Sequence, residues 1–83
     1  MQLTMLKCPT VMARVGQSRS ALYAAAKRGV FTPPIKWAPQ SSGWPEHEVN
    51  AILRARIAGK SDDEIRELVK QLVEARSLES VVA

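Results

Sequence analysis

The segment from Pro9 to Gly29 carries the helix start and stop signals that most restrict the fold of this chain. Pro9 suits the first turn of a helix, because the N–H that proline lacks would have no partner there. Gly16 accepts the left-handed conformation that ends many helices. Ser18 can cap a following helix by accepting a hydrogen bond from a free backbone N–H, and Gly29 ends that helix as Gly16 ends the first. The pattern predicts two short helices joined by a tight turn.

Charge is divided unevenly along the chain. Residues 1–44 contain six basic residues and no acidic residue, so this segment has a net charge of +6. Residues 45–83 contain eight acidic and six basic residues, which gives a net charge of −2. The competing explanation is that small domains often have a positive net charge without a functional reason. That explanation does not account for 44 residues without Asp or Glu. We therefore expect the first segment to approach a polyanion.

The second predicted helix, capped by Ser18, separates polar from apolar side chains. At about 100° per residue, the polar arc holds Arg19, Ser20, Tyr23 and Lys27. Leu22 and Ala25 lie on the opposite arc, where they can pack on neighbouring helices. Three consecutive alanines at 24–26 keep the helix slim, and a slim helix can enter a DNA major groove about 12 Å wide. We favour DNA recognition over a merely solvated face on a packed helix.

The polar arc supplies most of the candidate DNA contacts. Arg19 can donate two hydrogen bonds to the edge of a guanine, or it can bind a phosphate. Ser20 and Tyr23 can bond to a phosphate or a base, whereas Lys27 and Arg28 are better placed for phosphates. The full set of candidate DNA-binding residues is Arg14, Ser18, Arg19, Ser20, Tyr23, Lys27, Arg28 and Lys36.

The residue pattern after Gly29 is no longer helical and predicts a small β-hairpin. The prolines at 33–34 exclude a helix, and Ile35–Trp37 alternates apolar and polar residues as a strand does. Residues 39–41 have the composition of a turn, and residues 42–44 are expected to form the returning strand.

Two basic residues outside the second helix are candidate contacts. Lys36 in the hairpin can touch the DNA backbone or the minor groove, or it can be a solvated lysine without a partner. Arg14 in the first helix can touch a phosphate where that helix crosses the backbone. Trp37 and Trp44 are expected in the core rather than as platforms for stacked bases.

Two further helices follow the hairpin. Pro45 opens the third helix, and Gly59 ends it. Its apolar side chains fall on one face that we expect to be buried: Val49, Ile52, Leu53 and Ile57. Ser61 and Glu64 form a capping-box pattern for the fourth helix. That helix has a regular apolar stripe made of Ile65, Leu68, Val69, Leu72 and Val73.

These elements predict a mainly α fold with a small β-hairpin, in the form of a compact winged helix-turn-helix with an added C-terminal helix. We expect a DNA-binding domain over residues 1–58, the amphipathic helix over 59–77 and a frayed tail over 78–83. The fourth helix is expected to pack on the core of its own chain. It could instead form a homodimer, or serve as a protein-interaction module that binds another protein.

Composition argues against an enzyme. Cys8 is the only cysteine, which excludes an intramolecular disulfide and fits a reducing cytoplasm. His47 is the only histidine and lacks the second histidine of a zinc-protease helix, so it is expected to be solvated. The chain has no glycine-rich phosphate loop and no apolar run of the roughly 20 residues that span a membrane. We expect no catalytic site, no metal, no cofactor and no small-molecule ligand.

Several short segments together resemble a known family. They are Val15–Tyr23 (VGQSRSALY), Lys27–Phe31 (KRGVF), Pro34–Lys36 (PIK), Gly43-Trp44 and Glu48-Val49. With these segments, the stretch from Leu6 to about Ile57 resembles the AlpA family of phage and prophage transcriptional regulators. It is also similar to phage excisionases of the same winged fold.

The resemblance implies a small regulator that binds double-stranded DNA, often at integrase or excision genes. The chain departs from the family pattern in the hairpin, where Gln40–Ser42 contains no arginine. It also has Pro45 where an arginine is common and Ala24 where a bulkier residue is usual. We therefore expect sequence specificity to come from the second helix rather than from the hairpin.

Overall fold

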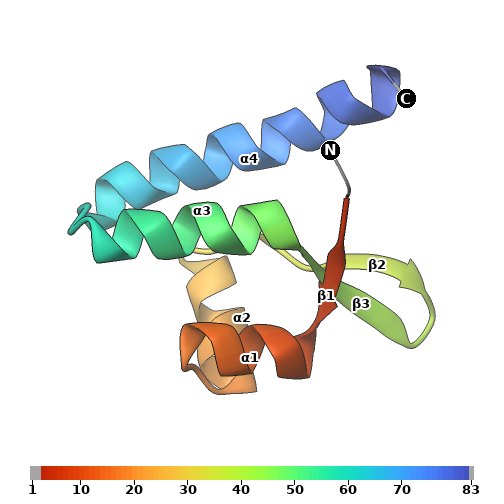
Figure 1. Cartoon of the computed structure of the whole chain (residues 1–83), viewed down its shortest axis with the longest axis horizontal. Helices are drawn as coiled ribbons and strands as arrows, with labels where there is room; N and C mark the ends of the chain where they lie inside the picture. Colours follow the sequence, from red (N-terminus) through yellow and green to blue (C-terminus); the bar gives the residue numbers. More distant parts are fainter. Residues whose placement is uncertain (1–2, 83) are drawn as a thin grey trace.

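The computed structural model describes residues 3–82, and the side chains of residues 3–77. Over this range the chain forms four helices and a three-stranded antiparallel sheet (Figure 1). In chain order the elements are β1 (Met5–Lys7), α1 (Cys8–Val15), α2 (Arg19–Lys27), β2 (Ile35–Ala38), β3 (Ser41–Pro45), α3 (Glu46–Ile57) and α4 (Asp62–Val82). The predicted fold class is confirmed, and the arrangement is compatible with a winged helix-turn-helix.

The turn between α1 and α2 follows the predicted capping chemistry. Gly16 has a φ of 68°, and its N–H donates to the carbonyl oxygen of Met12 at 2.9 Å. The Ser18 hydroxyl accepts a hydrogen bond from the backbone N–H of Ala21 at 3.1 Å. Gly29 follows α2 with a φ of 80°. Because each of these signals acts within a few residues, the sequence alone was sufficient to predict them.

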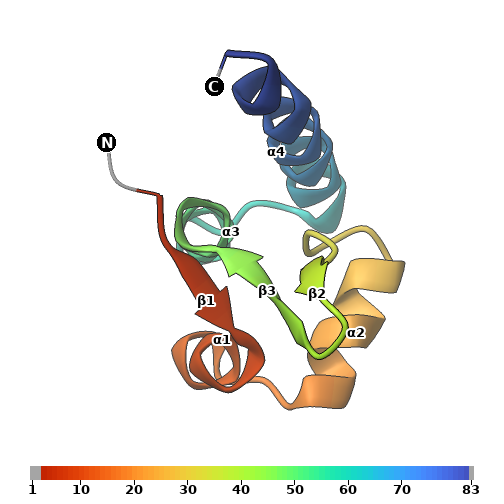
Figure 2. The ribbon, with the colours of Figure 1, turned by 90° about the vertical axis from the view of Figure 1, so that its right-hand side faces the viewer.

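The hairpin of β2 and β3 is confirmed, and a third strand joins it. The strand order is β1-β3-β2, so β3 lies in the centre of the sheet (Figure 2). Leu6 in β1 pairs with Trp44, and Lys7 pairs with Gly43. A side chain at Gly43 would collide with the backbone oxygen of Leu6, so a glycine is required where these two strands meet. No pattern in the sequence predicted β1.

Trp44 lies at the centre of the core, as predicted, and its side chain has no exposed surface. Its ring makes edge contacts with Tyr23 at a centroid distance of 6.0 Å and with Phe31 at 5.7 Å. Its indole N–H donates to the carbonyl oxygen of Thr32 at 2.7 Å. Trp44 therefore joins the sheet to α2 and to the segment that leads into the hairpin.

Two side chains predicted in the core lie on the surface. Trp37 is 48% exposed, because the pairing of β2 with β3 is irregular between Lys36 and Ala38 and leaves Trp37 without a partner residue. Ile57 is 85% exposed. At about 100° per residue it lies about 140° from the buried Ile52, outside the arc of α3 that faces the core.

Helix α4 runs back along α3 and buries its apolar stripe on its own chain (Figure 1). Ile65 and Val69 are buried, and the other residues of the stripe pack against the same core. The capping box is formed as predicted: the Ser61 N–H donates to Glu64 Oε1 at 3.0 Å, and the Glu64 N–H donates to Ser61 Oγ at 3.2 Å. The helix continues to Val82, so it extends past residue 77 into the segment that we expected to fray.

A buried ion pair, which no local sequence pattern predicted, fixes α4 on α3. Glu48 has no exposed surface, and Arg76 donates to its two carboxylate oxygens at 2.6 and 2.7 Å. Nη2 of Arg76 also donates to the carbonyl oxygen of Pro33 at 2.9 Å. One arginine of α4 thus holds both the start of α3 and the segment that enters the hairpin.

Candidate nucleic-acid interface

Helix α2 presents the polar arc to solvent and the apolar arc to the core. Leu22 is 1% exposed and belongs to the core, and Ala25 packs against the same core. The charged and polar side chains of the helix and its cap are exposed: Ser18, Arg19, Ser20, Lys27 and Arg28. The exposed Ala24 lies between them. The helix therefore offers a polar face to a partner while its opposite side anchors it to the domain.

Tyr23 combines an anchored ring with an accessible side. The side chain is 39% exposed, and the ring packs edge-on against the buried Trp44 at a centroid distance of 6.0 Å. Because the core holds one side of the ring, its contact with a partner needs little ordering of the side chain. Tyr23 therefore lies on the polar face of α2 and also contacts the core through Trp44.

Arg14 in α1 is committed to an ion pair. Its Nη2 lies 3.0 Å from Glu46 Oε2, at the start of α3, and both side chains are more than a third exposed. An exposed pair of this kind contributes about 0–1 kcal/mol to stability. Arg14 therefore differs from the candidate residues of α2, because a carboxylate already offsets its charge.

The C-terminal end of α2 is tied to α4. The carbonyl oxygen of Arg28 accepts a hydrogen bond from Nε of Arg66 at 3.0 Å, and Arg66 also pairs with Asp63 at 2.9 Å. The stem of Arg66 lies against Gly29. Arg66 was not predicted to act on α2, because the contact spans residues far apart in the sequence. It fixes the end of α2 without using the exposed side chain of Arg28.

The hairpin carries Lys36 on its edge strand. Lys36 in β2 is exposed and lies opposite Ser42 of β3, next to the exposed Trp37. A surface cavity of about 180 Å³ lies where the hairpin, the end of β1 and the starts of α1 and α2 meet. Its lining residues are Lys7, Cys8, Pro9, Arg19, Gln40, Ser41 and Ser42. Of these, Arg19 alone was predicted as a contact, because no local signal in the sequence marked Lys7 or the serines.

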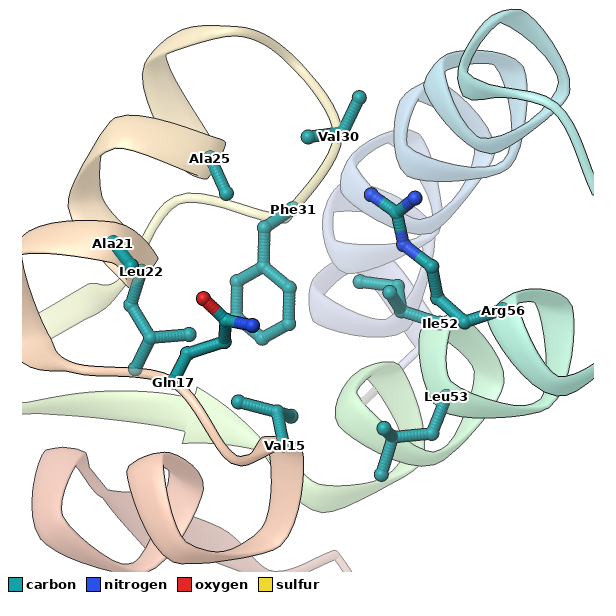
Figure 3. Close-up of a pocket in the computed structure, with 10 residues that line it drawn as sticks. All are labelled: Val15, Gln17, Ala21, Leu22, Ala25, Val30, Phe31, Ile52, Leu53 and Arg56. Atoms are coloured by element: carbon teal, nitrogen blue, oxygen red, sulfur yellow. The ribbon is translucent and has the colours of Figure 1, made fainter.

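A larger groove of about 440 Å³ lies on the other side of α2 (Figure 3). Figure 3 shows Leu22 and Ala25 of α2 on one side, Ile52 and Leu53 of α3 on the other, and Phe31 between them. Because α2 contributes its apolar arc to this groove, the groove does not belong to the polar face of the helix. The groove lies between α2 and α3 and is not part of the candidate DNA interface.

In the part of the chain that the structure describes, His, Cys, Asp and Glu form no group of three that could hold a metal ion. Cys8 is buried, and His47 is half-buried rather than fully solvated. Within residues 3–82, no helix is long and apolar enough to cross a membrane.

Comparison with known proteins places the chain in a family. Residues 4–57 match the family described as Prophage CP4-57 regulatory protein (AlpA). The chain belongs to the AlpA family. The resemblance predicted over Leu6 to Ile57 is thereby confirmed, and this is a family of regulatory proteins rather than of enzymes. Helix α4 lies beyond the residues that match.

A phage protein supports the same assignment. "Uncharacterized protein ORF88" of Enterobacteria phage P4 is 36% identical over 55 residues, which cover 66% of this AlpA-family chain. The matched segment spans 62% of the length of the phage protein. No solved structure matches the chain.

Proposed function

We propose that this AlpA-family protein is a sequence-specific regulator of phage or prophage type that binds double-stranded DNA. In this proposal α2 enters the major groove, while the hairpin and α1 lie along the DNA backbone. The observation that carries the proposal is the exposed polar face of α2 within a segment that has a net charge of +6 and no acidic residue. DNA association is favoured by basic side chains that replace counterions at the phosphates.

The exposed residues of α2 would have separate roles. Ser20 lies in the first turn of the helix and Tyr23 at its midpoint, and the N-terminal part of a recognition helix contacts base edges when it enters the groove. Lys27 and Arg28 lie at its end and would neutralise phosphates. Lys36 would contact the backbone or the minor groove from the hairpin. Arg14 would contribute less, because Glu46 already pairs with it at 3.0 Å.

The family description, a regulatory protein, supports a regulator over an excisionase with the same DNA contact. The position of α4 argues against a function built on that helix. A protein-interaction module or a homodimer formed through α4 would need its apolar stripe at the surface, but Ile65 and Val69 are buried within the same chain. We therefore propose that the unit that contacts DNA is a single chain in the cytoplasm.

Selection of bound duplexes from a random pool tests the proposal. The full-length protein is expected to enrich one short sequence motif, and a gel shift is expected to show tight binding to that duplex at low salt. Tyr23→Phe or Ser20→Ala is expected to change the enriched motif if these side chains contact bases. If no duplex is retained at low salt, the protein is not a DNA-binding regulator.

A further inference from the structure

The surface cavity beside the hairpin has the composition of an anion site. Two basic residues, Lys7 and Arg19, line it together with Gln40, Ser41 and Ser42. These residues come from three parts of the chain, the end of β1, the start of α2 and the β2–β3 hairpin, which converge in the lower half of Figure 2. The fold thus brings together polar groups that the sequence keeps far apart.

The two basic side chains at the cavity are available to a ligand. Both Lys7 and Arg19 are exposed, and neither forms an ion pair with a carboxylate among the residues that the structure describes. Two cations that line one cavity without a carboxylate give it a positive potential, so an anion placed there would be attracted to both. No acidic side chain lines the cavity, so no carboxylate of its lining takes that place.

The chemistry of the lining fits a phosphate. A guanidinium can donate two parallel hydrogen bonds to two phosphate oxygens, and an ammonium adds a compact charge. Serine can donate to a phosphate oxygen from its hydroxyl or its backbone N–H. The volume of about 180 Å³ corresponds to about six water molecules at about 30 Å³ each, which leaves room for a phosphate group.

The position of Arg19 connects the cavity to DNA. Arg19 is the first residue of α2 and lies on the arc that also holds Ser20 and Tyr23. A duplex that receives α2 in its major groove has a phosphate backbone along the rim of that groove, next to the start of the helix. The cavity then lies where one backbone phosphate would pass between α2 and the hairpin.

Resting on the proposed function, we propose that Lys7, Arg19, Ser41 and Ser42 form a binding site for one phosphate of the DNA backbone. Arg19 therefore binds a phosphate instead of reading a base. The hairpin, which contains no arginine between Gln40 and Ser42, contributes to affinity through its two serines. Base recognition is left to Ser20 and Tyr23.

Affinity measurements on two duplexes separate a phosphate contact from a base contact. Lys7→Ala and Arg19→Ala are each expected to weaken binding about tenfold on both the selected duplex and a scrambled one. Because both side chains contact the same phosphate, each substitution is expected to reduce the magnitude of the salt slope, the slope of log affinity against log salt concentration, by no more than about 0.9. Lys70→Ala, which removes an exposed lysine of α4, is the matched control and is expected to change neither quantity. Arg19→Lys is expected to keep the slope, because it keeps the charge.

Neutral methylphosphonate linkages, placed one at a time in the selected duplex, locate the phosphate. One linkage is expected to weaken wild-type binding about tenfold and to have no further effect on the Lys7→Ala/Arg19→Ala double variant. At every other linkage the wild type and the double variant are expected to lose affinity by the same factor. Additive losses at all linkages would overturn the proposed phosphate site.

The remaining outcomes separate the possible failures. If Arg19→Ala changes the preferred sequence with an unchanged salt slope, Arg19 reads a base and the phosphate site is wrong. If inorganic phosphate displaces DNA from the wild type more strongly than chloride of equal ionic strength, and not from the double variant, the ligand is free phosphate instead of DNA. If no duplex binds at all, the proposed function itself fails. Circular dichroism spectra identical to the wild type are expected for every variant, because the substituted side chains are exposed.

Discussion

The basic side chains of residues 1–44 and those of residues 45–77 have different surroundings. In the second segment Arg56, Lys60, Arg66 and Arg76 each pair with a carboxylate. In the first segment Arg14 is the one basic residue with such a pair among the described residues, and its partner Glu46 belongs to the second segment. The comparison teaches that similar numbers of cations can serve two purposes. Four of the six in the second segment pair with carboxylates of the fold, and those near α2 remain available for an external anion.

The largest expected effect concerns the most buried of these pairs. Arg76→Ala removes the partner of Glu48, which has no exposed surface, and leaves an uncompensated buried carboxylate. Breaking such a pair costs about 3–5 kcal/mol, so the free energy of unfolding in urea is expected to fall by that amount. The Glu48→Leu/Arg76→Met double variant is expected to recover most of it. A loss below about 1 kcal/mol for Arg76→Ala would show that the pair does not hold α4 in place.

Removing one lysine from each segment tests the comparison directly. Lys27→Ala in α2 is expected to weaken DNA binding about tenfold, because Lys27 would neutralise a phosphate. Lys70→Ala in α4 changes the net charge by the same amount and is expected to leave binding within twofold. Fluorescence anisotropy with a labelled duplex measures both. Equal losses for the two variants would mean that net charge alone, and not the face of α2, governs binding.

Arg14 sharpens the comparison, because it lies in the first segment but is paired like the residues of the second. Arg14→Ala breaks an exposed ion pair with Glu46, so stability is expected to fall by about 0.5 kcal/mol. DNA affinity is expected to change less than threefold. A loss as large as that of Lys27→Ala would place Arg14 on a phosphate and would show that Glu46 releases it when DNA binds.

The smallest expected effect concerns the start of α4. The hydrogen bond from the backbone N–H of Ser61, with added contributions from the Ser61 hydroxyl and the Lys60 ammonium, holds the pKa of Glu64 below its ordinary value. A lowered pKa stabilises the folded state above the pKa of the unfolded chain, and this contribution is lost as pH falls through the lower folded value. Glu64→Gln is expected to lower the thermal midpoint slightly at pH 7. Its difference from the wild type is expected to shrink in acid, and a difference that grows in acid would contradict this account.

The parts of the fold that depend on near neighbours could be predicted from the sequence. Gly16 and Ser18 define the turn between the first two helices, and Ser61 with Glu64 defines the start of α4, because each signal acts across about one helical turn. The hairpin was predictable from its prolines and alternation. Strand β1 was not, because three residues with one buried side chain, Leu6, give no periodic pattern.

The contacts between distant residues could not be predicted. Nothing near Glu48 in the sequence indicates that Arg76, 28 residues later, donates hydrogen bonds to both carboxylate oxygens of Glu48. The exposure of Trp37 depends on an irregular strand pairing that composition does not reveal. The polar arc of α2 was predicted from helical spacing alone. The cavity between Lys7, Arg19 and the hairpin serines required the folded sheet.

A salt titration of the wild-type protein on its selected duplex tests the central claim most directly. If α2 and its surroundings neutralise about five phosphates, the logarithm of the affinity is expected to fall with the logarithm of the salt concentration at a slope near −4.5. The Lys7→Ala/Arg19→Ala double variant is expected to give a slope about 0.9 smaller in magnitude, because both side chains contact the same phosphate. A wild-type slope near zero, or no binding at low salt, would contradict the claim that the cations of residues 1–44 form a DNA-binding surface.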